Sequence, residues 1–515
     1  MRRLSMPLDF WLLTALFLWV VIVAVRARGT LAAALAPSRG PARLWLLLLF
    51  AVGLGLRLLV VPHTHYTYDD SFFHLDIATN LRNTLRFFVR LDDFMEGARA
   101  EHFPKWMPVH HYLVSFVFRL APPTGATVQA YNAVVGALTV PAAFFLGRAL
   151  FEKDLSGLLL AALLCLYPVH LKFSGSSGIE PTSTLLTTLA LTFLAVHWRR
   201  GDSSTARLAL TLSVLCALTR IDNAATTALV CGFVVLKALR EQDGAARRAR
   251  ILAVLGALAF VAALTLISFS AYSSWRARAA PANPLSALRF LFTNPLNTPL
   301  LPVLAILGAI ALWRRDRILA AALVGTWLVY LFAYTCLHRI DVDYVDFHRF
   351  HLNTCPFQLA LAAAALDFLA RRPGHLGVAG LAVVGALYGA FVVLSAGSIS
   401  HQYWPECSAE VEWLERTAPS LGADAVVVTP APIFVRAVAG LRTALLTEEL
   451  VSRSFRTQRL FYYCPPYRAP DLAVGGADRS AAELAGRFSL VPFAVKRTAS
   501  GDECGLFRML EREAP

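Results

Sequence analysis

The feature that most constrains this chain is a series of apolar runs, each close to the roughly 20 residues that an α-helix needs to cross a bilayer. The runs lie near 9–25, 43–61, 126–148, 155–172, 181–197, 206–220, 222–239, 250–271, 299–313, 317–336, 352–370 and 375–397. Hydrophobic residues make up 57% of the 515 residues and charged residues only 16%, whereas a soluble domain has about 45–50% and about 25%. The sequence therefore predicts a polytopic α-helical membrane protein with about 12 transmembrane helices.

Two shorter segments and the C-terminal tail depart from this pattern. The segment 110–123, "HHYLVSFVFRLAPP", is too short to span a bilayer and predicts a helix in the membrane interface, with His110 and His111 as interfacial polar residues. Another surface helix is predicted to begin near Asp70 and run to Arg82. From about residue 400 the sequence indicates a strand, Ala425–Thr429, then a Pro-led helix and further strands. We therefore divide the chain into a membrane domain, 1–397, and a small C-terminal α/β domain, 398–515.

Arginine and lysine in the short loops predict the orientation in the membrane. One set of loops, which includes "GRALFEK", "WRRGDSSTAR", "WRRDR" and "RRPGH", carries at least two basic residues per loop and is predicted to face the cytoplasm. The alternate set includes the large first loop, 62–125, and the tail after Gly397; both are predicted to be extracytoplasmic, as is the N-terminus. The net charge of +14 follows from this loop bias. Because no stacking aromatics alternate with the basic clusters, no nucleic-acid partner is expected.

Cysteine usage differs between the two predicted domains. Five cysteines lie in apolar runs or at their ends and are expected to be small core residues: Cys165, Cys216, Cys231, Cys336 and Cys355. Cys407, Cys464 and Cys504 lie in the tail, where an extracytoplasmic location would allow one disulfide, although the sequence does not choose the pair. The sequence contains no Walker or GxGxxG pattern, so neither an ATP-driven nor a dinucleotide-dependent activity is expected.

Polar residues gather at the predicted outer ends of the helices. They are Asp69, Asp70 and His74 in the first loop, Glu180 before an apolar run, Arg220 and Asp222 in "LTRIDNA", and His348 and Arg349 in "DFHRFH". Each has an ordinary structural explanation. Aspartate is a favoured N-cap, Glu180 suits the first turn of a helix, and Arg220 can pair locally with Asp222. The "DFHRFH" segment can be a solvated loop; His348 and His351 have a spacing that suits a metal, but no third ligand is fixed by spacing.

Together these groups suit a site at the boundary between membrane and water. Charged side chains are costly to keep near lipid, so they point to function. Carboxylates can accept a proton or hold a divalent cation, and arginine can bind a phosphate through two parallel hydrogen bonds. A lipid phosphate would present its phosphate at this depth, with its chain in the bilayer.

Over about residues 45–370 the ordered motifs resemble the GT-C superfamily of membrane glycosyltransferases. The likeness is greatest to the branch of dolichyl-phosphate-mannose protein mannosyltransferases and bacterial aminoarabinose transferases. The motifs are, in order, "YDDSFFHLDIATNL", "FPKWMPVHHYLVSFVFRLAPP", "FFLGRALFEKD", "SGSSGIEP", "LTRIDNA" and "HRFHLNTCPFQLALAAAAL". Ile221 stands where that branch usually has proline, and "PVHH" where it has "PPL". The oligosaccharyltransferase branch is similar in "DDSFFHLD", but no WWDYG-like motif is present.

The resemblance implies a hexosyl- or pentosyltransferase. Such an enzyme would move one sugar, with inversion, from a polyprenyl-phosphate donor to a lipid, glycan or protein acceptor outside the cytoplasm. The resemblance also implies a multi-pass protein of a bacterial inner membrane, with its active site on the periplasmic side.

By position, the resemblance implies Asp69 as the catalytic base and Asp70 as the residue that orients it. A divalent cation, Mg²⁺ or Mn²⁺, held by the same pair is the open alternative. The predicted substrate-binding residues are His74, Glu180, Arg220, Asp222, His348 and Arg349, of which the two arginines are the candidates for the donor phosphate.

Two other functional classes fit the sequence. A transporter or flippase of lipid-linked sugars would have the same polytopic architecture. However, no acid or arginine lies near the middle of a predicted span, where transporters usually place binding groups. A non-catalytic protein of envelope glycan assembly, whose outer domain binds a partner, would also fit. Sugar transfer by the purified chain would exclude both.

Overall fold

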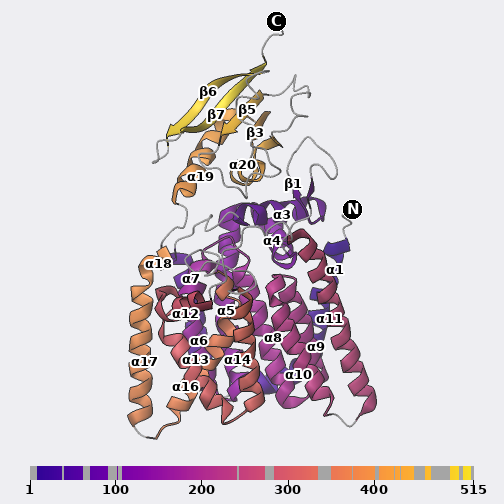
Figure 1. Ribbon diagram of the computed structural model, residues 1–515, viewed down its shortest axis with the longest axis vertical. Coiled ribbons are helices and arrows are strands. Elements are labelled where there is room, and N and C mark those ends of the chain that lie inside the picture. Colours follow the sequence, from indigo (N-terminus) through magenta and orange to yellow (C-terminus); the bar gives the residue numbers. More distant parts are fainter. Residues whose placement is uncertain are drawn as a thin grey trace.

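The computed structural model describes residues 8–37, 40–61, 70–90, 101–102, 107–240, 243–272, 284–334, 349–373, 375–400, 405–422, 424–429, 431–445, 459–464, 488–497 and 503–511. A bundle of long helices carries two shorter helices at one end and, beyond them, an α/β domain (Figure 1). The first helix begins at this same end, where Thr14 Oγ1 lies 2.8 Å from the hydroxyl of Tyr112.

The bundle is built from helices that follow the predicted apolar runs. They are α1 (Leu8–Leu35), α2 (Gly40–Gly55), α5 (Gly125–Phe151), α6 (Asp154–Cys165), α7 (Pro168–Ser174), α8 (Glu180–Arg200), α9 (Ser203–Ala217), α10 (Ala224–Ala238), α11 (Gly244–Tyr272), α13 (Leu300–Trp313), α14 (Arg317–Phe332), α16 (Cys355–Ala370) and α17 (His375–Leu394). Shorter helical pieces are η1 (Leu56–Val60, a π turn), η3 (Ile221–Asn223), α12 (Pro284–Thr293), η5 (Pro295–Asn297) and α18 (Ala396–Ser400).

Several of these helices have the length and composition of membrane spans. Among the described residues, Phe10–Leu35, Gly40–Val60, Gly125–Phe151, Ile221–Ala238 and His375–Leu394 meet both criteria. The pair α6 and α7 would add a sixth span, and α9, α13, α14 and α16 are shorter apolar helices. Every predicted run thus coincides with a helix, as expected of a polytopic membrane protein. These criteria do not confirm the predicted number of spans.

Local sequence explains where several helices begin and end. Pro168 suits the first turn of α7 and cannot continue α6, so the predicted run 155–172 consists of two helices bent by 59°. Gly201 ends α8 in the left-handed conformation, with φ 72°, which glycine adopts without a Cβ clash. Asp202 then caps α9 by accepting a 2.8 Å hydrogen bond from the backbone N–H of Thr205. The "RRGDSST" segment is therefore a tight turn between antiparallel neighbours.

The two helices at the end of the bundle are α3 (Asp70–Thr84) and α4 (Val109–Leu120). Both predicted helices are present, since α3 begins at Asp70 and α4 covers most of 110–123, but most of their described side chains are buried. They pack together and against the start of α5 through Leu75, Val114, Phe118 and Val128. Between them runs a two-stranded hairpin of β1 (Val89–Arg90) and β2 (Glu101–His102).

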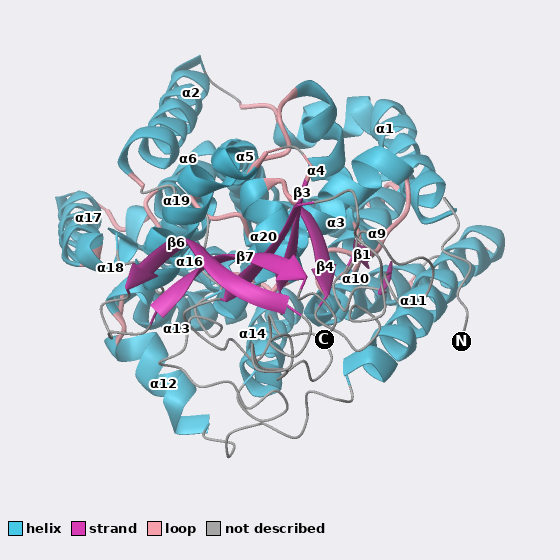
Figure 2. Ribbon diagram, turned by 90° about the horizontal axis from the view of Figure 1, so that it is seen from above, coloured by secondary structure: helices cyan, strands magenta, loops and turns pink. Residues whose placement is uncertain are grey.

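The C-terminal region forms a mixed sheet with helices on one side. Its elements are α19 (Pro405–Thr417), η7 (Ala418–Leu421), β3 (Ala425–Thr429), α20 (Pro432–Ala439), β4 (Arg442–Leu445), β5 (Arg459–Cys464), β6 (Phe488–Arg497) and β7 (Glu503–Glu511). The strand order is β4-β3-β5-β7-β6, with β3 parallel to both neighbours and β7 antiparallel to β5 and β6. Seen along the bundle, the sheet lies across the helix ends (Figure 2). The predicted strand Ala425–Thr429 and the Pro-led helix are confirmed; α19 and β5 were not predicted.

One apolar core joins this domain to the bundle. Phe72, Ile77 and Leu81 of α3 belong to the same buried cluster as Ile433 and Phe434 of α20. The cluster continues into α4, α8 and α9. The C-terminal domain therefore buries its helical face against α3 rather than enclosing a separate core on that side.

The arginine-rich loops meet at the opposite end of the bundle. Arg199 pairs with Glu152 across the loops after α8 and α5, and Arg200 donates to the backbone oxygen of Ala33 near the end of α1. Arg250 donates to the backbone oxygen of Gly201. The loops predicted to share one side thus lie together, away from α3 and the C-terminal domain (Figure 1). Which end faces the cytoplasm stays a prediction from the charge bias.

Candidate functional site

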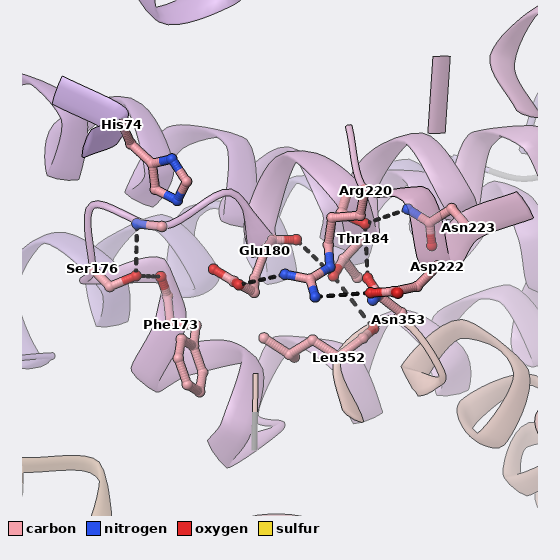
Figure 3. A network of polar contacts seen from close by, with 12 residues as sticks. His74, Phe173, Ser176, Glu180, Thr184, Arg220, Asp222, Asn223, Leu352 and Asn353 are labelled. Atoms are coloured by element: carbon pink, nitrogen blue, oxygen red, sulfur yellow. Dashed lines mark hydrogen bonds and ion pairs between the residues drawn. The ribbon is translucent and has the colours of Figure 1, made fainter. Parts of the chain in front are cut away.

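A buried ion-pair network lies where α8 begins and α9 ends. Arg220 Nη1 donates to Glu180 Oε1 at 3.0 Å, and Arg220 Nη2 donates to Asp222 Oδ2 at 2.9 Å (Figure 3). The side chain of Glu180 is 0% exposed and that of Arg220 7%. Glu180 stands in the first turn of α8, whereas Arg220 precedes the short turn η3 that links α9 to α10. The predicted local pair of Arg220 and Asp222 is confirmed, and it is extended by a carboxylate 40 residues away.

Neutral side chains surround this network and hold the helix ends together. Asn223 Nδ2 donates to Ser183 Oγ at 2.8 Å, and Ser183 Oγ donates to Asn353 Oδ1 at 2.8 Å. Asn353 Nδ2 donates to the hydroxyl of Tyr334, and the hydroxyl of Tyr330 donates to Asn223 Oδ1. All five residues are buried. Networks of this kind fix a single geometry. None was predicted, although polar residues in the first turns of apolar helices are a signal that could have found them.

Arg349 lies next to this network, with an aromatic ring between the two arginines. The guanidinium carbon of Arg220 is 4.3 Å from the centre of the Phe350 ring, and that of Arg349 is 5.2 Å from it. Arg349 is 7% exposed. The two predicted phosphate ligands are therefore neighbours, although they are far apart in the sequence. Two buried guanidinium groups therefore share one ring, beside the two carboxylates that pair with Arg220.

His74 joins α3 to the same region through the histidines of α4. His74 Nδ1 is 2.9 Å from His111 Nε2, and His111 Nδ1 is 3.0 Å from the backbone oxygen of Met107. His110 Nδ1 is 3.0 Å from the hydroxyl of Thr182, two residues beyond Glu180. The expectation that His110 and His111 are interfacial polar residues is wrong, because they are 1% and 0% exposed.

These contacts define how the histidine protons are arranged. Burial lowers the pKa of His111 to about 3, so its ring is neutral at physiological pH. The Met107 oxygen can only accept, so His111 carries its proton on Nδ1 and accepts at Nε2 from His74 Nδ1–H. The His74 ring is directed toward the segment that carries Ser176 and Glu180 (Figure 3).

The remaining predicted residues are only partly covered by the structure. Asp69 and His348 lie outside the described residues, and Asp70 is described only as the first residue of α3. Within the described ranges, no group of three or more His, Cys, Asp or Glu side chains is placed to hold a metal ion. His351 has both ring nitrogens in hydrogen-bonding contacts, with Asn297, Gln358 and Thr354, which favours a structural role over a metal.

The cysteines are likewise only partly described. Cys165, Cys216, Cys231 and Cys355 are buried and not in disulfides, as expected of core residues. Cys336 and Cys407 are not described in side-chain detail, and neither are Cys464 and Cys504. The backbone register places Cys464 opposite Gly505, next to Cys504 on the neighbouring strand. The disulfide among the tail cysteines stays a prediction.

Sequence reasoning missed several buried charges in the membrane domain, among them Arg57, Lys172 and Asp367. Arg57, in the π turn η1 that ends α2, is fully buried. It contacts His170 Nδ1 at 2.7 Å, the Gly53 oxygen at 2.8 Å and Ser174 Oγ at 3.2 Å. A lone arginine inside the apolar run 43–61 was a sufficient signal. Because its partners are uncharged and belong to α2 and α7, it joins these helices rather than the network around Arg220.

Solved structures with the same overall fold are membrane glycosyltransferases. ArnT from Cupriavidus metallidurans bound to undecaprenyl phosphate matches with a TM-score of 0.62 at 12% identity, over 90% of this chain and 98% of that one. AglB, an oligosaccharyltransferase from Archaeoglobus fulgidus in complex with an inhibitory peptide and a dolichol-phosphate, matches at 0.53 and 13%, over 92% and 74%. The mycobacterial arabinofuranosyltransferase AftD matches at 0.54 and 16%, over 91% and 41%.

The extent of these matches differs among the proteins. The chain spans 65% of an Archaeoglobus fulgidus oligosaccharyltransferase in the apo form and less than half of AftD. No protein-family model and no curated protein sequence matches the chain. At identities this low the structural likeness establishes the fold alone. On that basis the resemblance found in the sequence is confirmed, and the chain has the GT-C fold of membrane glycosyltransferases.

Proposed function

We propose that the chain is a membrane glycosyltransferase that moves one sugar from a polyprenyl-phosphate donor to an acceptor at the end of the bundle that carries α3. One observation carries the proposal: in a GT-C fold, buried Arg220 and Arg349 share one aromatic ring beside the start of α8. Arginine can bind a phosphate through two parallel hydrogen bonds. Undecaprenyl phosphate and dolichol-phosphate are bound in two structures of this fold, which supports a lipid phosphate as the anion.

Arg220 already has two carboxylate partners. It uses Nη1 for Glu180 and Nη2 for Asp222. Because these two carboxylates offset its charge, we assign the main contact with the donor phosphate to Arg349. Arg220 holds the two carboxylates in place.

In the proposed reaction the acceptor attacks the anomeric carbon in a single displacement. Asp69 takes the proton from the acceptor hydroxyl or amine, whose oxygen or nitrogen forms the new bond to that carbon. The bond between the carbon and the phosphate oxygen breaks, and its electron pair leaves with the lipid phosphate. An ionised aspartate at this position can accept that proton. Inversion follows from attack opposite the leaving group.

The other predicted residues surround the sugar in this proposal. Asp70 orients Asp69, and a divalent cation at the pair is the alternative that chelation tests. His74 offers a ring nitrogen to a hydroxyl group, and Glu180 and Asp222 offer carboxylate oxygens. His348 stays a candidate by sequence position alone. The site is proposed to face the periplasm of a bacterial inner membrane, in keeping with the charge bias of the loops.

The deciding experiment uses the full chain purified in detergent. It is incubated with polyprenyl phosphates that carry a labelled pentose or hexose and with lipid, glycan and peptide acceptors in turn. The expected result is labelled acceptor and free lipid phosphate in equal amounts. Arg349→Gln is the test variant. Arg372→Gln, which replaces an arginine at the opposite end of the bundle, is the matched control.

The alternative functions predict different products. A transporter of lipid-linked sugars would move the intact donor across a vesicle membrane without releasing lipid phosphate. A non-catalytic assembly protein would do neither. Absence of sugar transfer with every donor and acceptor pair, from a folded chain that binds the donor, would contradict the proposal.

A further inference from the structure

An ion pair links the C-terminal domain to α3 of the bundle. Arg436 of α20 donates through Nη1 to Asp76 Oδ1 at 2.9 Å and to the backbone oxygen of Arg90 at 2.7 Å. Its Nη2 donates to Thr443 Oγ1 in β4 at 2.9 Å. One guanidinium therefore contacts α3, the hairpin strand β1 and the C-terminal sheet. Asp76 and Arg436 are 360 residues apart in the sequence.

Asp76 is fixed by further hydrogen bonds on its second oxygen. Oδ2 accepts from Asn80 Nδ2 and from the backbone N–H of Arg90, both at 3.0 Å. The side chain of Asp76 is 3% exposed and that of Arg436 17%. A carboxylate with partners on both oxygens is held in one orientation. The contact is therefore directional, and water has little access to it.

Aromatic contacts among Phe72, Phe434 and Tyr463 lie beside the ion pair. The rings of Phe72 and Phe434 meet edge to face at 4.9 Å, and Phe434 stacks on Tyr463 of β5 at 6.1 Å. The Tyr463 hydroxyl donates to Glu410 Oε1 of α19 at 2.6 Å. These aromatic contacts supply apolar burial that holds the domain on α3. A buried ion pair adds little net stability to such a contact, but its hydrogen bonds fix the relative geometry.

The opposite face of α3 points toward the candidate site. His74 lies four residues after Asp70, so the two share one face of the helix, whereas Asp76 is two residues further and lies on the other face. His74 contacts His111 on one side, while Asp76 contacts Arg436 on the other. Figure 1 shows α3 between α20 above and α4 below.

We propose that Asp76 and Arg436 are positioning residues, through which the C-terminal domain sets the place of α3 and hence of Asp70 and His74 in the site. The inference rests on the proposed function, because it assigns the domain a part in the same reaction. Neither residue touches substrate in this account. They act by holding α3, which begins at Asp70 and carries His74.

The test compares Arg436→Gln and Asp76→Asn with the double variant and with Arg459→Gln. Arg459 forms an ion pair of similar length with Asp424, 3.1 Å, inside the same domain and half exposed. We call the ion pair of Asp76 and Arg436 the latch. Arg436→Gln and Asp76→Asn, the two latch variants, are each expected to lower kcat about 10-fold or more while changing donor affinity by less than about 2-fold. The double variant should be no worse than either single one, because both remove the same contact. The control should keep the parent kcat.

Hydrogen exchange of the α3 amides provides a second measurement that does not depend on catalysis. Exchange is expected to rise at least about 10-fold in the latch variants and not in the control. Unchanged exchange in Arg436→Gln would overturn the latch, whatever the activity. Faster exchange with unchanged kcat, measured well below the unfolding temperature, would overturn the positioning role. A parent chain without transfer activity overturns the proposed function, and the exchange result then decides the latch alone.

Discussion

The two ends of the helical bundle hold ion pairs of nearly the same length in very different surroundings. Arg220 and Glu180 are 3.0 Å apart with side chains 7% and 0% exposed. Arg199 and Glu152 at the other end are 2.8 Å apart, but 25% and 64% exposed. An exposed pair contributes about 0–1 kcal/mol, because water and salt screen it. A buried pair cannot lose one partner without leaving an uncompensated charge.

This difference separates two uses of charge in a membrane protein. Basic residues at the Arg199 end are predicted to orient the chain in the membrane, a role that depends on their number and not on contacts. Charges at the Arg220 end are enclosed by Ser183, Asn223 and Asn353, so their positions are fixed. Two cavities of about 240 and 270 Å³ are lined by Arg199 at the other end. That end also holds the pair of Arg148 and Asp154, whose side chains are each 13% exposed.

The largest expected effect is on stability at the buried end. Arg220→Gln leaves two carboxylates without their cation and should lower the free energy of unfolding by about 3–5 kcal/mol. Thermal unfolding in detergent measures it. Glu180→Gln combined with Arg220→Gln should recover part of the loss, since a buried charge is removed. A single variant as stable as the parent would show that the network is open to water.

The next effect is on catalysis. Asp69→Asn should lower the transfer rate by roughly 100-fold or more, the usual scale for a lost general base, while the protein stays folded. Asp70→Asn should be milder. If a divalent cation bridges the two carboxylates, both variants should fail and a chelator should inhibit the parent.

The capping alternative gives the opposite result for the same variants. Asp69 directly precedes α3, the position that an N-cap occupies, and asparagine caps as well as aspartate. Under that alternative both Asn variants stay active, whereas Asp69→Ala loses about 0.5–2 kcal/mol of stability. Normal turnover by Asp69→Asn would end its assignment as the base.

Donor binding should depend on Arg349, one of the two arginines that contact the Phe350 ring. Arg349→Ala should weaken binding of the lipid donor by about 10- to 100-fold, the equivalent of losing about 1.5–3 kcal/mol from a charged hydrogen bond. The rate at saturating donor should change less, because a phosphate clamp also acts in the ground state. A donor titration checks this, with Arg372→Ala as control. Unchanged affinity would remove Arg349 from the site.

Most helices could be predicted from the sequence, because apolar runs of membrane length are a local signal. The strand Ala425–Thr429 was equally clear as a fully apolar run bounded by turn residues. Strand β5 was missed because its six residues lack alternation, and the bend at Pro168 was overlooked although proline was a direct signal for it.

The candidate site was predicted in part. Polar residues at the outer helix ends identified Glu180, Arg220 and Arg349, which the structure brings together. Their neutral partners and the pair of Asp76 and Arg436 carry no local pattern. Those contacts depend on how distant segments pack, and a single sequence does not report that packing.

A smaller, pH-dependent effect is expected from His111, one of the two buried histidines of α4. Unfolded His111 takes up a proton near pH 6.5, whereas folded His111 does so only near its pKa of about 3. Between these values the unfolded state binds more protons, so stability falls as the pH drops from about 6.5, by about 1.4 kcal/mol per unit. Above about 6.5 the contribution is constant. His111→Gln should flatten this slope by one proton, as measured by unfolding at a series of pH values. An unchanged slope would mean that water reaches the ring.

The smallest effect is expected at the exposed end, from the substitution that matches Glu180→Gln. Glu152→Gln removes only the ion pair, because Arg199 keeps its hydrogen bond to the backbone oxygen of Leu150. Glu152 is 64% exposed, so in its ionised form it is solvated with or without Arg199. The expected loss is at most about 1 kcal/mol, and it should shrink further as salt screens the pair. Thermal unfolding of the two Gln variants at low and high salt makes the comparison direct. If Glu152→Gln destabilises as much as Glu180→Gln, then burial is not what distinguishes the two ends, and the case for a site at the Arg220 end loses its physical basis.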